Sequence, residues 1–174
     1  MNRKMLAMLV VWAVMIMGVC GAKAETTGWE TDFGKASTNA LKSGSYMMLD
    51  FSGSDWCGWC MKLDKEVFSK GEFKSFAKTN LVCVLVDFPR EKHQSKKLKD
   101  QNAELAKKYG IRGYPTVIIL SPKGDLVGQT GYQEGGAKKY VNDLKGMIEE
   151  FKKQQPRQEA EKKPIEGVPA MHKP

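Results

Sequence analysis

Two cysteines separated by two residues, Cys57 and Cys60, are the side chains of this sequence best suited to chemistry. They lie in the stretch Ser-Asp-Trp-Cys-Gly-Trp-Cys-Met-Lys, residues 54–62, directly after an apolar segment. Such a pair can bind a metal, attach a haem, form a structural disulfide or exchange electrons with other disulfides. The surrounding residues discriminate among these four uses.

The sequence argues against the first three uses. A structural zinc site takes four ligands, usually from two such pairs, whereas this chain has one pair and two histidines, His93 and His172. Haem attachment requires a histidine directly after the second cysteine, and that residue is Met61. A purely structural disulfide across two residues closes so short a loop that it contributes little stability. We therefore expect no metal and no cofactor at this pair.

The context of the pair favours redox chemistry. Residues 46–51 are expected to form a buried strand that ends just before the pair, and a helix is expected to begin at Cys57. Unpaired backbone N–H groups and the helix dipole at that point stabilise a thiolate. Cys60, one turn further along, would be shielded and close enough to attack a mixed disulfide on Cys57.

A second candidate element is the stretch Tyr-Gly-Ile-Arg-Gly-Tyr-Pro-Thr, residues 109–116, which leads into a predicted strand. A proline between a glycine-containing loop and a strand is a natural site for a cis peptide bond, which orients backbone groups as a regular strand cannot. An ordinary trans Pro115 at the start of the strand is the alternative, and it is favoured on frequency alone.

Helices and strands alternate around these motifs. The first expected helix is capped by Thr31 or Asp32 and ends at Gly44. Further helices are expected from Cys57 to Phe68, in a short segment capped by Ser69, from Asn102 to Tyr109 and up to Phe151. Strands are expected at 46–51, 81–86, 116–120 and 126–129. This order predicts an α/β sandwich built on one central mixed sheet.

Together, Trp-Cys-Gly-Trp-Cys at 56–60 and Ile-Arg-Gly-Tyr-Pro-Thr at 111–116 resemble the thioredoxin superfamily. The resemblance covers about residues 29–151 and implies a thioredoxin-like three-layer α/β/α sandwich. Within the superfamily, Phe-Ser-Gly-Ser-Asp-Trp-Cys at 51–57 and Val-Asp-Phe-Pro at 86–89 resemble the exported DsbH-type oxidoreductases.

The resemblance implies roles for individual residues. Cys57 would be the nucleophile, Cys60 the resolving cysteine and Pro115 a cis-proline that faces the disulfide. Tyr114 would occupy the substrate-contacting position before the proline. The remaining motif residues would support the pair: Trp56, Gly58 and Trp59. For Trp56, a platform beside the site and simple core filling are both open.

One departure from the family concerns proton transfer. Thioredoxins carry a buried aspartate six residues before the first cysteine, but here that residue is Phe51, and Asp50 lies one residue earlier. If the loop has gained a residue, Asp50 can still serve; otherwise strand alternation turns its carboxylate to the other face. The lysine that usually faces this acid aligns with Cys83, which we expect to be a buried small hydrophobe.

Other departures concern the surroundings of the pair. Trp59 stands where many relatives have proline or histidine, and because tryptophan supplies no charge to a thiolate, a reducing pair is favoured. Lys62 is expected to be a solvated surface side chain, with electrostatic help to Cys57 as the alternative. Residues 88–101 form an insertion relative to thioredoxin and are expected to be solvated, with contact to partners as the alternative.

The first 24 residues are typical of a secretory signal peptide. A basic head at 2–4 precedes an almost wholly apolar run at 5–19, and Ala-Lys-Ala at 22–24 suits signal peptidase. The run is short for a membrane span. Acylation of Cys20, as in a lipoprotein, is the alternative, although the preceding valine is not one of the small residues that such sites carry.

Cleavage after Ala24 would leave one domain at 25–151 and a polar tail at 152–174. The tail can bury too little apolar surface to offset its ordering entropy, so we expect disorder. The net charge of +8 is spread along the chain, without a nucleic-acid signature.

The sequence therefore predicts an exported or periplasmic thiol–disulfide oxidoreductase, a monomer that reduces disulfides of exported proteins through the Cys57–Cys60 pair. The resemblance implies a membrane-embedded thiol donor of the DsbD type. A disulfide isomerase or oxidase, and a non-catalytic thioredoxin-fold module in cytochrome maturation, are the alternatives.

Overall fold

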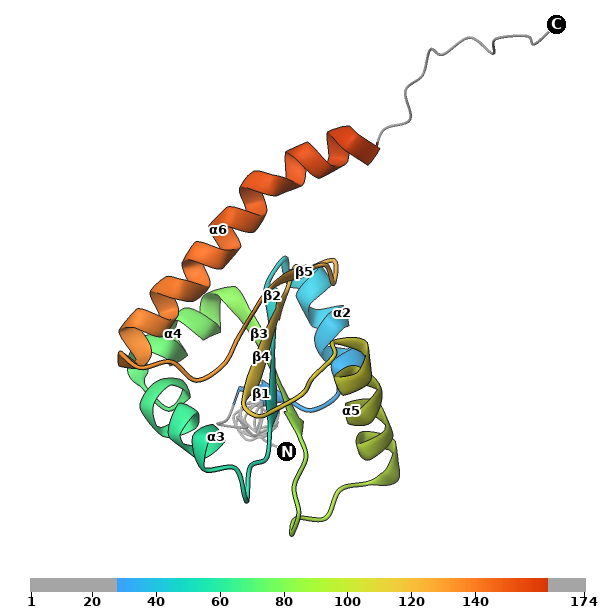
Figure 1. Cartoon of the computed structure of the whole chain (residues 1–174). Helices are drawn as coiled ribbons and strands as arrows, with labels where there is room; N and C mark the ends of the chain where they lie inside the picture. Colours follow the sequence, from blue (N-terminus) through green and yellow to red (C-terminus); the bar gives the residue numbers. More distant parts are fainter. Residues whose placement is uncertain (1–27, 163–174) are drawn as a thin grey trace, which may run out of the picture.

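The computed structural model describes residues 28–162 (Figure 1). The predicted signal peptide, with Cys20, and residues 163–174 of the predicted tail lie outside the described residues. Within them no helix is both long enough and apolar enough to cross a membrane.

Five strands of the described region form one sheet, in the order β1-β3-β2-β4-β5. They are β1 (Trp29–Glu30), β2 (Tyr46–Ser52), β3 (Leu81–Asp87), β4 (Thr116–Leu120) and β5 (Leu126–Thr130). β1 and β2 run parallel to β3, whereas β4 is antiparallel to both β2 and β5. The sheet is therefore mixed, as predicted, and β1 is an element that the sequence did not reveal.

Helices cover both faces of this sheet (Figure 1). α2 (Phe33–Ser43) and α5 (Lys96–Lys108) lie on one face, where Ala36, Ala40 and Leu105 join the apolar side chains of the central strands. The other face carries α3 (Gly58–Leu63), the π-helical turn η2 (Asp64–Phe68), α4 (Gly71–Asn80) and α6 (Gly136–Lys162). The three layers confirm the predicted α/β/α sandwich.

Strand alternation in β2 decides which side chains reach the Cys pair. Met47, Leu49 and Phe51 are buried against α2 and α5, whereas Met48 is buried on the opposite face with the side chains of η2, α4 and α6. Because side chains alternate along a strand, Asp50 shares the face of Met48. Its carboxyl group therefore lies on the side of the sheet that carries α3.

Two predicted helix starts need correction. α5 begins at Lys96, six residues before the predicted Asn102, because the Ser95 hydroxyl caps it by accepting the Leu98 N–H at 3.3 Å. Only 88–95 of the predicted insertion are therefore non-helical. α4 is preceded by Lys70 without a side-chain cap, and the predicted cap Ser69 instead donates its hydroxyl to Asp64 at 3.2 Å.

The predicted start of disorder at Lys152 is also wrong, since α6 continues to Lys162. Phe151 is the last core side chain of this helix, and Lys152 pairs with Glu149 at 2.8 Å. Lysine, glutamine and glutamate are good helix formers, so a packed helix can extend into a polar segment. In Figure 1 this end of α6 projects away from the sheet.

Candidate active site

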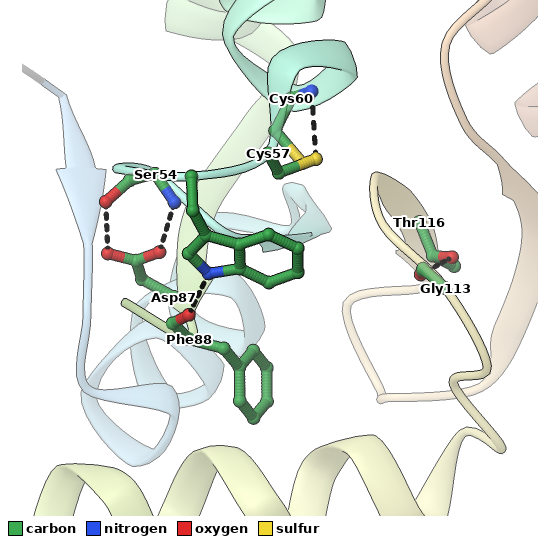
Figure 2. Close-up of a disulfide and its surroundings, with 8 residues drawn as sticks. Ser54, Cys57, Cys60, Asp87, Phe88, Gly113 and Thr116 are labelled. Carbon is green, nitrogen blue, oxygen red and sulfur yellow. Dashed lines mark hydrogen bonds between the residues drawn. A yellow bond between two sulfur atoms is a disulfide. The ribbon is translucent and has the colours of Figure 1, made fainter. Parts of the chain in front are cut away.

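The two cysteines of the pair lie at the start of α3, joined by a disulfide (Figure 2). Cys57 is the N-cap residue, and its sulfur accepts the backbone N–H of Cys60 at 3.2 Å. Both side chains are buried, with exposed fractions of 7% and 5%. The predicted strand–loop–helix context is thus present, and the cap donor would also stabilise a Cys57 thiolate.

A tight turn at Gly53 brings the strand end to the helix start. The Gly53 carbonyl accepts the N–H of Trp56 at 3.2 Å and that of Cys57 at 2.8 Å. The Trp56 indole packs so closely on Gly53 that a Cβ atom there would overlap it. Glycine is therefore required by the close approach of the ring.

Trp56 is a half-buried platform beside the pair. Its indole N–H donates to the Phe88 carbonyl at 2.7 Å (Figure 2). The ring of Tyr114 meets it edge-on, with centroids 5.8 Å apart and planes at 90°. Because Tyr114 precedes Pro115, this contact places residues 109–115 (the proline loop) beside residues 53–57 (the Cys57 loop).

The Tyr114–Pro115 peptide bond is cis, one of the two conformations that the sequence left open. In the same loop the Thr116 hydroxyl donates to the Gly113 carbonyl at 2.8 Å (Figure 2). Gly131 packs against the Pro115 carbonyl, so closely that a Cβ atom would come within 2.9 Å of the oxygen. The loop is thus held from both sides of the proline.

On the other side of the disulfide, Trp59 is 58% exposed. Its ring lies 5.2 Å from that of Tyr132, and the Lys62 ammonium lies 5.0 Å and 4.9 Å from the two ring centroids. The Tyr132 hydroxyl donates to Glu66 at 2.7 Å. Lys62 therefore packs against aromatic rings instead of being simply solvated. Tyr132 and Glu66 were not predicted as neighbours of the pair, because they lie far apart along the chain.

Asp50 is buried on the side of Cys60. The two residues line one pocket of about 450 Å³, together with Asp64 and the apolar side chains of Trp29 and Phe68. Among the described residues, Asp50 Oδ1 has no hydrogen-bond partner. Burial raises the pKa of Asp50 to about 7, with smaller contributions from the negative charges of Asp64 and Asp87. The acid therefore lies on the same side of the sheet as the pair.

Cys83 is a buried free thiol, as predicted. Burial, followed by the nearby charge of Asp50, raises its pKa to about 12. A thiol with so high a pKa is almost wholly protonated at neutral pH and reacts slowly. Cys83 therefore belongs to the core and not to the reacting groups.

The start of the predicted solvated insertion packs directly against the Cys57 loop. Asp87 accepts both the N–H and the hydroxyl of Ser54, at 2.8 Å and 2.6 Å (Figure 2). Asp55 accepts three consecutive backbone N–H groups, those of residues 90–92. Residues 90–92 are exposed, as expected for a solvated segment, but their backbone is bound to the residues before Cys57. Ser54 and Asp55 are site residues that sequence reasoning missed, because their partners lie far along the chain.

Residues 28–162 contain no group of three or more histidine, cysteine, aspartate or glutamate side chains arranged to hold a metal ion.

A family model described as a thioredoxin-like domain matches residues 33–145. The Disulfide bond reductase DsbH of Chlamydia pneumoniae is 32% identical over 120 residues, which cover 69% of this chain and 72% of that protein. The Thioredoxin-related protein DsbJ of the same organism is 34% identical over 93 residues, 53% of this chain but 27% of that protein.

A solved structure described as DsbH Oxidoreductase superposes with a TM-score of 0.67 at 32% identity, over 70% of this chain and 83% of that chain. The region matched by the family model contains Cys57, Cys60 and Pro115. The chain therefore belongs to the thioredoxin-like domain family, and its Cys57–Cys60 pair supports a role as a thiol–disulfide oxidoreductase.

Proposed function

We propose that this protein reduces disulfides of exported proteins, with Cys57 as the nucleophile and Cys60 as the resolving cysteine. The observation that carries the proposal is the disulfide at the start of α3, in which Cys57 accepts the helix N–H of Cys60. That donor favours the ionised form of the Cys57 sulfur once the pair is reduced.

Reduction proceeds in two exchanges. The Cys57 thiolate attacks one sulfur of the substrate disulfide, so that a Cys57–substrate bond forms and the other substrate sulfur leaves as a thiolate. Cys60, after losing its proton, attacks the Cys57 sulfur and releases the second substrate thiolate. The substrate gains two electrons, and the Cys57–Cys60 disulfide is left oxidised.

Asp50 is the group we assign to the Cys60 proton. It lines the same pocket as Cys60, and with a pKa raised to about 7 by burial it is present in both protonation states near neutral pH. A base is most effective when its pKa lies near the working pH. The carboxylate can accept the thiol proton as Cys60 attacks and later release it to solvent water.

The reducing direction is supported by the small number of groups that stabilise the Cys57 thiolate besides the Cys60 N–H. Among the described residues its sulfur accepts one hydrogen bond, from Cys60. Trp59 is uncharged, and the Lys62 ammonium lies over the rings of Trp59 and Tyr132. Since stabilising the thiolate makes a disulfide more oxidising, a weakly stabilised pair donates electrons readily. Similarity to a Disulfide bond reductase supports the same direction.

The deciding experiment is equilibration of the Cys57–Cys60 pair against glutathione. We expect a reduction potential near or below about −180 mV, the value of protein disulfide isomerase. A value near about −120 mV, that of DsbA, would overturn the reductase assignment in favour of an oxidase.

Trapping separates the roles of the two cysteines. A Cys60→Ser variant should accumulate mixed disulfides with substrate proteins, because the resolving step is lost, and non-reducing gels followed by mass spectrometry would identify them. Cys57→Ser should trap none. Cys83→Ser is the matched control and should behave as the unmodified protein, since Cys83 is buried away from the exchange.

The setting we propose is the periplasm or an equivalent exported compartment, reached after cleavage near Ala24. There a reductase must be recharged, and a membrane thiol donor of the DsbD type would do so. N-terminal sequencing of the protein recovered from the periplasmic fraction tests the export step. Recovery of the uncleaved chain from the cytoplasm would contradict it.

A further inference from the structure

Residues 88–92 are anchored to the Cys57 loop by one carboxylate. Asp55 Oδ1 accepts the Arg90 N–H at 3.0 Å, and Oδ2 accepts the N–H groups of Glu91 and Lys92 at 2.9 Å and 3.1 Å. These bonds lower the pKa of Asp55, the bond from Arg90 contributing most. The carboxylate thus remains charged at neutral pH and its bonding capacity is largely used within the protein.

Further bonds hold the same segment from both ends. The Phe88 N–H donates to the Ser52 carbonyl at 2.8 Å, and the Phe88 carbonyl accepts the Trp56 indole N–H at 2.7 Å. At the other end the Lys92 ammonium donates to the Ser54 hydroxyl at 3.0 Å. The backbone that carries Arg90 is therefore fixed relative to the residue next to Cys57.

Arg90 lies over the platform beside the disulfide. The guanidinium carbon is 4.0 Å from the centroid of the Trp56 ring. A guanidinium that lies against an aromatic ring keeps its five N–H donors, which lie in its plane, for other partners. Among the described residues the Arg90 side chain forms no hydrogen bond or salt bridge, and the residue is exposed.

Among the described residues, Arg90 is the cation that lies over Trp56, whereas Arg112, which is also exposed, lies in the loop that precedes Pro115. Lys92 donates to Ser54, and Asp55 accepts three backbone N–H groups. Glu91 is exposed and adjacent in sequence. Lys62, on the other side of the disulfide, lies over aromatic rings.

We propose that Arg90 binds a carboxylate that flanks the reactive cysteine of the protein substrate, and that Asp55 is the positioning residue that holds Arg90 there. The preferred partner is thus an exposed segment with aspartate or glutamate beside its disulfide. This inference rests on the proposed disulfide exchange. Arginine suits the task because it presents paired donors to a carboxylate.

The experiment compares two disulfide-linked peptides that differ only in the residues flanking the cysteine, glutamate in one and glutamine in the other. For the unmodified protein, kcat/KM should be about three- to tenfold higher for the glutamate peptide, mainly through KM. The preference should shrink at high salt, because exposed charges are screened.

Three variants test the assignment. Arg90→Gln should abolish the preference while leaving reduction of the glutamine peptide within about twofold. Asp55→Asn should reduce the preference in the same direction, because the segment loses its anchoring carboxylate. Lys99→Gln, which removes an exposed positive charge on α5, is the matched control and should retain the full preference.

The outcomes distinguish the two proposals. If the unmodified protein reduces both peptides equally, or if Arg90→Gln keeps the preference, the inference about Arg90 is wrong although the oxidoreductase proposal stands. If neither peptide is reduced by the protein with its thiols intact, the proposed function itself fails. A preference that Lys99→Gln also removes would reflect overall charge and would count against Arg90.

Discussion

The two tryptophans of the Cys pair lie in opposite situations. Trp56 is hydrogen-bonded to the Phe88 carbonyl, packed on Gly53 and overlaid by Arg90. Trp59 is 58% exposed, with one aromatic neighbour, Tyr132. One flank of the disulfide is thus built into the fold, whereas the other presents an apolar surface to solvent. From this difference we predict that Trp56 positions the site and that Trp59 contacts partners.

The largest expected effect comes from removing the packed Trp56 side chain. Trp56→Ala should lower the free energy of unfolding by about 2–4 kcal/mol, because it empties a packed site and leaves the Phe88 carbonyl without its donor. Urea denaturation measures the loss, and disulfide reduction should slow along with it. A stability loss no greater than that of Trp59→Ala would break the comparison.

Asp50→Asn tests the buried acid without changing Trp56 or Trp59. Burial raises the pKa of Asp50 from 3.8 to about 7, so the folded state holds a proton that the unfolded state releases above pH 4. The wild-type protein therefore loses stability as the pH rises from about 4 to 7, and the variant does not. At pH 8 the variant should be more stable by about 2–4 kcal/mol, and at pH 3 the two should agree.

The matching kinetic result is a slower resolving step in Asp50→Asn, measured as longer-lived mixed disulfide in single turnovers near pH 7. The first attack by Cys57 should change little. An unchanged rate of the resolving step across pH 6–8 would show that Asp50 takes no part in the mechanism. It would not affect the comparison of Trp56 with Trp59.

A smaller effect is expected at Gly53, on which the Trp56 ring packs. Gly53→Ala should destabilise the protein by about 1–3 kcal/mol, because the added Cβ would overlap the Trp56 indole. Gly58→Ala is the matched control, since nothing lies within 4 Å of a Cβ at that position. Thermal unfolding distinguishes the two, and equal shifts would mean that the Trp56 contact is loose.

The smallest effect on stability should come from replacing the exposed Trp59. Trp59→Ala should change the free energy of unfolding by less than about 1 kcal/mol, because most of the ring is already in solvent. It should instead raise KM for protein disulfides several-fold and leave a small-molecule disulfide unaffected. A large loss of stability, or no change in KM, would contradict its assignment as the contact surface.

Local patterns allowed much of this architecture to be predicted. The apolar run of β3, the strand before the Cys pair, and the helix capped by Asp32 all extend over consecutive residues. The predicted boundaries failed where a single polar side chain decides the start, as Ser95 does for α5. β1 was not predicted, because a strand of two residues is too short to show an alternation of apolar and polar residues.

The sequence by itself determined the reactive pair, the helix that begins at it and the proline loop, because each is encoded by neighbouring residues. Only the tertiary structure decided which face Asp50 occupies, how far burial raises its pKa, and that Asp55 holds residues 90–92 beside Trp56. Those features depend on strand register and on hydrogen bonds between segments far apart in the chain. Such contacts leave no periodic pattern in the sequence, so they become visible only in the folded structure.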